Sequence, residues 1–180
     1  QSSWLKEAED VIQQRFGLTA QGADTFEVIV NENDTGGYAA FVKSSTPVGT
    51  AAKADIIEMQ FDLPDFTAPH TSPTSEADRT VAHELVHAVQ ATNFYWNALV
   101  DGTTTRELGG GGGGQWFKEG TAEFIHGEDN TVKGYLGTTP TDAEITALMA
   151  NIGNGDGSWS DSKQYAAAYL AVRYLHDEIK

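Results

Sequence analysis

The sequence predicts an α+β fold, in which a helix and a small sheet come first and helices fill the second half. Apolar residues recur at helical spacing in five stretches: 3–16, 76–93, 115–126, 141–152 and 160–180. Three short runs between the first two helices alternate apolar and polar residues, as strands do. We expect one domain over residues 1–180, with an N-terminal lobe at 1–94 and a helical C-terminal lobe at 95–180.

The predicted sheet follows the first helix, which is expected to end at Gly17. The strands at 25–31 and 38–43 flank an Asp-Thr-Gly-Gly turn, so we expect them to pair as a hairpin. The third strand, at 55–63, places apolar side chains on one face and polar side chains on the other. The sheet is therefore expected to have one buried face.

The composition limits both partners and metal ligands. With 26 acidic and 11 basic side chains, the net charge is -15, which repels nucleic acids and anionic membrane surfaces, so neither partner is expected. The chain has no cysteine, so a metal ion would have to be held by histidines and carboxylates. No apolar run is long enough to span a membrane, and the first residues do not resemble a signal peptide.

The segment 80–91, T-V-A-H-E-L-V-H-A-V-Q-A, carries the strongest chemical signal. His83 and His87 are four residues apart and therefore share one face of a helix, where they could hold one zinc ion. Glu84 is placed to act as a general base. A hydrolytic zinc normally takes three protein ligands and a water molecule, so one ligand is missing from this helix.

The helix predicted at 115–126 carries Glu119 and Glu123 on one face. Two glutamates at this spacing are often only a solvated surface, but either could supply the missing ligand. Gly120 costs roughly 1 kcal/mol relative to alanine in a helix, which indicates close packing against another backbone. This helix is expected to end at Gly127.

The last two predicted helices are expected to contribute mainly to the hydrophobic core. Thr141 and Glu144 form a capping box for the first of them. The second is expected to be capped by Ser160 and to bury one face, formed by Tyr165, Tyr169, Val172, Leu175 and Ile179. The turn at 154–158 could bind calcium, and the glycine run at 109–114 predicts a flexible connector.

Two strings, H-E-L-V-H at 83–87 and W-F-K-E-G-T-A-E at 116–123, resemble the gluzincin metallopeptidases, whose fold is thermolysin-like. The second string is similar to that of bacterial collagenases. The chain also resembles flagellinolysin, the metallopeptidase domain inserted in the variable region of some bacterial flagellins. This resemblance covers nearly the whole chain and rests on four segments: 4–10, 82–89, 116–127 and 169–175.

The resemblance implies a zinc-dependent endopeptidase in which His83, His87 and Glu119 bind the metal. It also implies that Glu123 accepts a hydrogen bond from a ligand histidine, which we expect to be His83. We expect Glu84 to move the proton of the attacking water, and Tyr165 to donate to the oxyanion.

Substrate is expected to pair with the strand at 55–63 as an added strand, which requires that strand to lie at an edge of the sheet. Its predicted contact residues are Ile57, Glu58, Met59 and Gln60. The expected substrates are extracellular proteins, and the resemblance implies flagellin subunits as partners and the flagellar filament as location. Two alternatives remain open: a catalytically silent surface domain of flagellin, and a secreted collagenase-like peptidase.

Overall fold

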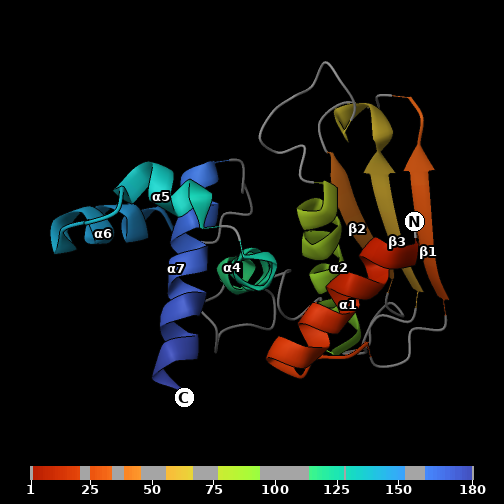
Figure 1. Cartoon of the computed structure of the whole chain (residues 1–180), viewed down its shortest axis with the longest axis horizontal. Helices are drawn as coiled ribbons and strands as arrows, with labels where there is room; N and C mark the ends of the chain where they lie inside the picture. The colour runs from red at the N-terminus through yellow and green to blue at the C-terminus, as the bar shows by residue number, and fades with distance from the viewer. Residues whose placement is uncertain are drawn as a thin grey trace. The chain divides into compact units, whose positions relative to one another are not determined.

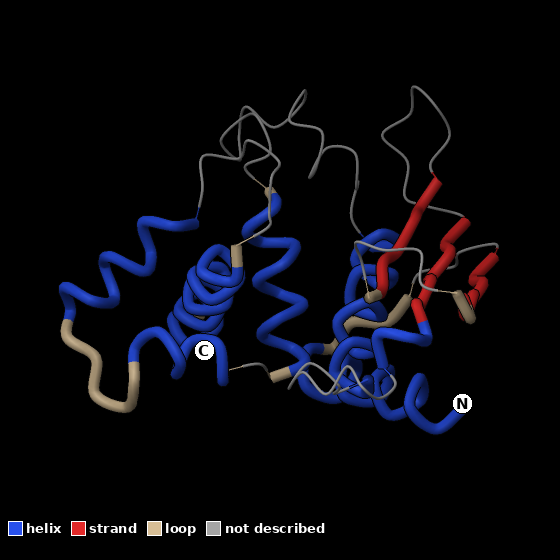
Figure 2. The backbone as a smooth tube through the Cα atoms, turned by 90° about the horizontal axis from the view of Figure 1, so that it is seen from above, coloured by secondary structure: helices blue, strands red, loops and turns tan. Residues whose placement is uncertain are grey.

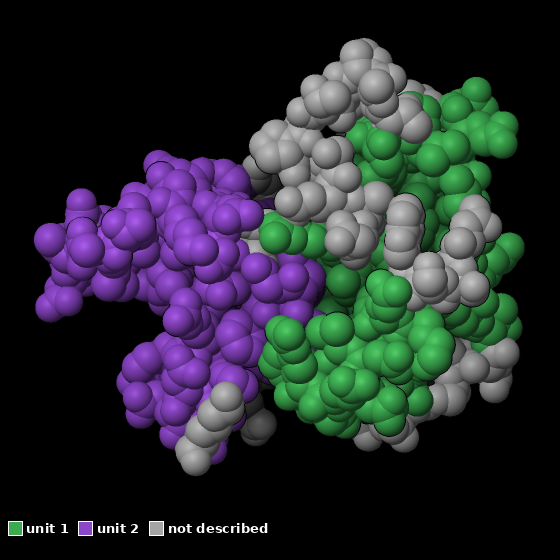
Figure 3. Space-filling view, in the orientation of Figure 1, with its two compact units in different colours: residues 1–96 green, residues 97–180 purple. Residues whose placement is uncertain are grey.

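The computed structural model describes residues 2–20, 25–33, 39–45, 56–66, 77–93, 114–127, 129–152 and 161–179. The chain divides into two compact units, Gln1–Trp96 and Asn97–Lys180, which Figure 3 colours green and purple. This division lies close to the predicted lobe boundary at residues 94 and 95. Unit 1 combines helices with a sheet, whereas unit 2 is helical in its described residues, as expected of an α+β chain.

In its described residues, unit 1 consists of two α-helices and a three-stranded sheet (Figure 1). The helices are α1 (Ser2–Phe16) and α2 (Ala77–Asn93), and the strands are β1 (Thr25–Asn31), β2 (Ala40–Ser45) and β3 (Ile56–Asp62). A short 3-10 helix, η1 (Leu63–Phe66), follows β3. Helix α1 packs against α2, which in turn packs against β2 and β3. The core between them contains Ile12 of α1, Ile57 and Met59 of β3, and Val86 of α2, all essentially inaccessible to solvent.

The strand order in the sheet is β1-β3-β2, so the predicted hairpin of β1 and β2 is wrong. Strand β3 lies between them, parallel to β1 and antiparallel to β2. Its apolar residues alternate as predicted, and Ile57 and Met59 are the most buried side chains of the sheet. A strand with such a buried face is stabilised most in the centre, where both neighbours share its core and bond its backbone.

The central position of β3 also overturns its predicted role in substrate binding. Residues 56–62 pair with β1 over their whole length and with β2 over residues 56–61. The backbone of Ile57, Glu58, Met59 and Gln60 is therefore engaged on both sides and cannot accept an added strand. The edges of the described sheet are β1 and β2.

A charged pair on the polar face of the sheet fixes the register of β2 on β3. Lys43 lies directly opposite Glu58, and its Nζ donates to the Glu58 carboxylate at 3.1 Å. This hydrogen bond, assisted by a second one from Gln60, lowers the pKa of Glu58. Opposite charges at directly paired positions stabilise a sheet, whereas a one-residue slip would remove this contact.

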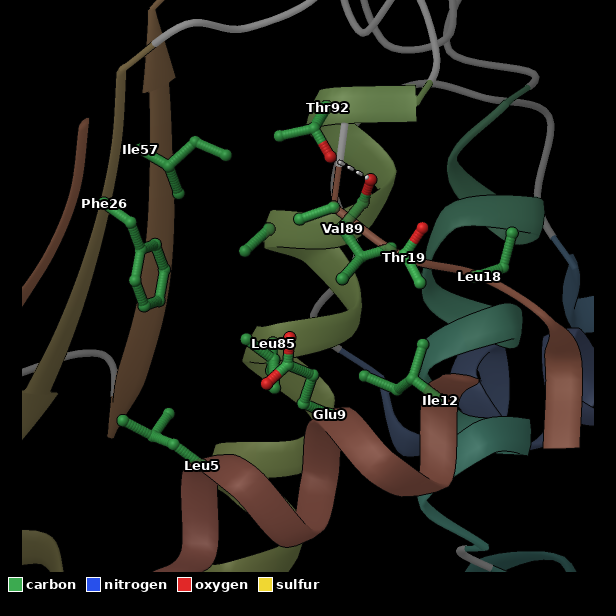
Figure 4. A pocket seen from close by; sticks show the side chains of 12 residues that line it. Leu5, Glu9, Ile12, Leu18, Thr19, Phe26, Ile57, Leu85, Val89 and Thr92 are labelled. Carbon is green, nitrogen blue, oxygen red and sulfur yellow. Dashed lines mark hydrogen bonds between the residues drawn. The ribbon is translucent and has the colours of Figure 1, made fainter. Parts of the chain in front are cut away.

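A cavity of about 320 Å³ lies inside unit 1 between the helices and the sheet (Figure 4). Leu5 and Ile12 of α1, Phe26 and Ile57 of the sheet, and Leu85 and Val89 of α2 all contribute to its largely apolar wall. Phe26 is 44% exposed although it shares the sheet face of buried Ile57. The core of unit 1 is therefore less tightly covered over β1 than over β3.

Unit 2 is organised around α7 (Ser162–Glu178), against which α4, α5 and α6 all pack (Figure 2). These helices span Gln115–His126, Asn130–Leu136 and Asp142–Met149, and a 3-10 turn, η2, covers Ala150–Ile152. The core holds Val132, Leu148, Ala166 and Tyr169. Gly120 meets the backbone of α7 as predicted, because a Cβ added there would lie 2.4 Å from the carbonyl oxygen of Ala168.

The helix ends of unit 2 mostly follow the sequence signals. Gly127 ends α4 with φ of 83°, and Thr141 and Glu144 form the predicted capping box. The backbone N–H of Thr141 bonds the Glu144 carboxylate and so lowers its pKa. Helix α7 differs in one respect, since its N-cap is Asp161 and not Ser160.

The C-terminal part of α7 is more exposed than its periodicity predicts. Tyr169 and Val172 are buried as expected, but Leu175 and Ile179 are 42% and 84% exposed. The described helices that pack on α7 do not cover Leu175 or Ile179. Residues 109–113 of the glycine run and the turn at 154–158 lie outside the described residues. Within the described residues, no helix is long and apolar enough to cross a membrane.

Candidate metal centre

Helix α2 brings the two motif histidines of unit 1 together. Its core face is formed by Val81, Leu85, Ala88 and Val89, which are all buried, and this fixes the direction of the remaining faces. The Nε2 atoms of His83 and His87 lie 3.0 Å apart, with the rings nearly perpendicular. His87 is 5% exposed, whereas His83 is half-buried.

A third side chain of α2, Gln90, determines which nitrogen of His87 carries a proton. The Oε1 atom of Gln90 lies 3.0 Å from Nδ1 of His87, and Gln90 is only 2% exposed. An amide oxygen can only accept a hydrogen bond, so Nδ1 must be the donor. In the neutral ring this leaves the lone pair on Nε2, where it faces His83 and could bind a metal.

Glu84 is buried beside the histidines, with 7% of its surface exposed. Its Oε2 atom is inaccessible and has no hydrogen-bond partner among the described residues. Burying a carboxylate oxygen without a donor is costly unless another group, such as water or substrate, completes its bonding. The position therefore suits a proton acceptor that acts on a bound molecule.

The two glutamates of α4, which the sequence left as alternative metal ligands, differ in burial and in their partners. Glu119 is 5% exposed, and its Oε1 atom receives a hydrogen bond from Gln115 at 2.9 Å. The ammonium group of Lys118 lies 3.2 Å from the same oxygen. Glu119 is therefore a buried carboxylate with one oxygen held by two donors.

Glu123 has a different partner within unit 2. Its Oε2 atom lies 3.3 Å from Nε2 of His126, three residues further along α4. Sequence reasoning missed His126, although the (i, i+3) spacing of a carboxylate and a histidine was a usable signal. The bond predicted from His83 to Glu123 would connect the two units and stays a prediction.

The tyrosines of α7 differ in burial. Tyr169 is buried and its ring packs at 5.9 Å from that of Phe124, which makes it a core residue. Tyr174 is 65% exposed. Tyr165 lies in the first turns of the helix and is half-buried, which is compatible with a hydroxyl that reaches a bound substrate.

The donors on these two helices fit zinc. The side chains that could hold a metal ion include His83 and His87 of unit 1 and Glu119 of unit 2. Two histidines and one glutamate form a common ligand set of catalytic zinc. Zn–N bonds of about 2.05 Å at a tetrahedral angle place two nitrogens about 3.3 Å apart, close to the 3.0 Å observed between the histidines.

Three comparisons of the chain, with protein-family models, curated proteins and solved structures, found no match.

Proposed function

We propose that this protein is a zinc-dependent endopeptidase with a thermolysin-like, gluzincin arrangement of its two helices. The observation that carries the proposal is the pair of Nε2 atoms on α2, 3.0 Å apart, beside a buried glutamate oxygen without a described donor. A structural role for H-E-x-x-H would explain two packed histidines. It would not explain a buried carboxylate oxygen left unsatisfied, which has a free-energy cost.

In this proposal His83 and His87 of unit 1 and Glu119 of unit 2 are the metal ligands. Glu119 is preferred to Glu123 because it is the more buried carboxylate and because it groups with both motif histidines, whereas Glu123 groups with His83 and His126. Zinc bound to these residues would supply Lewis acidity, which polarises the carbonyl of a peptide bond. The motif resemblance to gluzincins supports the same set of ligands.

The remaining chemistry belongs to side chains of the protein. Glu84 accepts a proton on its carboxylate as the water oxygen bonds to the carbonyl carbon. It then returns this proton to the amide nitrogen as the C–N bond breaks, so the products are an acid and an amine. Tyr165 donates a hydrogen bond to the carbonyl oxygen while that atom carries negative charge.

The substrate backbone would bind to β2 in place of β3. Strand β2 is an edge of the described sheet, and it packs against α2, the helix that carries Glu84. An extended peptide added to such an edge is held by main-chain hydrogen bonds and can carry varied side chains. Broad sequence specificity follows from this mode of binding.

Metal analysis and proteolysis test the proposal together. The purified protein is expected to bind one zinc ion per chain and to cleave a mixed peptide library, with cleavage sites identified by mass spectrometry. Chelation should abolish cleavage, and added zinc should restore it. Replacing His83 with alanine should remove both zinc and activity. Zinc without cleavage would favour the silent surface domain, and absence of zinc would contradict the proposal.

We further propose that the peptidase is displayed on a flagellar filament and acts on extracellular proteins. Support comes from the resemblance of residues 82–89 and 116–127 to flagellinolysin. Many copies on one filament would raise the local concentration of sites and offset weak substrate binding. Washed filaments should carry chelator-sensitive proteolysis and label with antibody to this chain. Activity and label confined to the medium would instead favour a secreted collagenase-like peptidase.

A further inference from the structure

Two glutamines lie about one helical turn from the proposed ligands, Gln90 beside His87 and Gln115 beside Glu119. We propose that both are positioning residues. Gln90 bonds the ring nitrogen of His87 that would not bind the metal, and Gln115 bonds a carboxylate oxygen of Glu119. This inference rests on the function proposed above. It adds two residues that do not touch the metal but set the orientation and basicity of the groups that do.

Gln90 is the better defined of the two. It is 2% exposed and lies in a stretch of α2 whose neighbours Val86, Val89 and Ala91 are also buried. A buried amide is costly unless its polar atoms are bonded, and packing alone would be served by an apolar side chain of similar length. Its bond to Nδ1 of His87 fixes the ring tautomer and thereby presents the Nε2 lone pair.

Gln115 acts on the carboxylate ligand in the same way. Its amide nitrogen donates to Oε1 of Glu119, the oxygen that Lys118 also approaches. Both donors act on the same oxygen and therefore limit the orientations that the carboxylate can adopt. Lys118 offsets part of the charge of this buried carboxylate, and Gln115 fixes its rotation.

Measurement of zinc affinity tests the inference and does not depend on enzymatic activity. Hydrogen-bond partners of metal ligands typically contribute 10–100-fold to metal affinity. Gln90→Met and Gln115→Met keep the side-chain length and remove the hydrogen bond, so each should weaken zinc binding by about 10–100-fold in competition with a chromophoric chelator. Gln90→Glu keeps an acceptor for Nδ1 and should remain near the wild-type affinity.

A matched control separates this effect from a general loss of stability. Gln14 lies on the exposed side of α1, so Gln14→Met changes a helical glutamine that is far from both ligands in sequence and should leave zinc affinity unchanged. Circular dichroism of each metal-free variant shows whether the fold is intact. A folded Gln90→Met protein that binds zinc as tightly as the wild type would overturn the inference for Gln90.

The tautomer of His87 in the metal-free protein provides a second, independent test. In the metal-free wild type, ¹⁵N spectra of the imidazole should show the proton on Nδ1, and Gln90→Met should lose this preference. Zinc binding by a wild type whose His87 carries the proton on Nε2 would overturn the inference and leave the zinc function standing. A wild type that binds no zinc would instead overturn the proposed function, and the inference with it.

Discussion

Replacing Glu84 with glutamine is expected to lower peptide hydrolysis by about a thousandfold and to leave zinc binding unchanged. The substitution preserves size and burial but removes the group that accepts the proton, a role that contributes roughly 10²–10⁴-fold. Glu84 is not a proposed ligand, so the metal should stay bound. Turnover of a fluorogenic peptide and metal content, measured on the same preparation, give both quantities.

The control for this variant is Glu7→Gln on the exposed side of α1, which makes the same chemical change away from the motif. It should retain full activity. If Glu84→Gln cleaves at the wild-type rate, Glu84 is not the base and the proposed mechanism is wrong. If the variant loses zinc as well as activity, Glu84 belongs to the metal site and not to proton transfer.

Gly120→Ala is expected to destabilise unit 2 by a net amount of about 2 kcal/mol. The new Cβ would lie 2.4 Å from the carbonyl oxygen of Ala168 and 2.7 Å from its carbonyl carbon, both backbone atoms of α7. Overpacking typically costs roughly 1–3 kcal/mol, and helix propensity offsets about 1 kcal/mol of that. We expect the upper end, because the clash is with a helical backbone and not with a movable side chain.

Gly134→Ala is the matched control, because Gly134 lies within α5 and a Cβ there meets nothing within 4 Å. It should raise stability by about 0.5–1 kcal/mol. Urea unfolding in the presence of a chelator, followed by circular dichroism, compares the two variants without any contribution from bound metal. Equal stability of the two variants would show that α4 and α7 do not pack as closely as the structure has them.

Most of the described helices were predictable because their signals are local, but α5 was not predicted. Periodicity placed α1, α2 and α4, and the residues Gly127, Thr141 and Glu144 marked helix ends. The sheet order was not predictable in this way, since it depends on pairing between distant segments. The turn signal between β1 and β2 favoured a hairpin, whereas the pairing of Lys43 with Glu58 became apparent only in the structure.

The candidate site shows the same division between local and non-local information. Spacing alone placed His83 and His87 on one face, because four residues make about one helical turn. Choosing Glu119 over Glu123 required the burial of each carboxylate and the contacts of Gln115 and His126. Gln90 escaped sequence reasoning because its role depends on side-chain rotamers that no spacing rule specifies.

Because β3 lies between β1 and β2, the sheet of unit 1 cannot form early in synthesis on the ribosome. The first 45 residues contain α1, β1 and β2, yet each of them docks on β3 or α2, which are made later. Until residues 56–62 emerge, β1 and β2 lack the central strand with which both of them pair. Because closing distant contacts slows folding, unit 1 should remain susceptible to proteases and to chaperone binding during synthesis until α2 has left the exit tunnel.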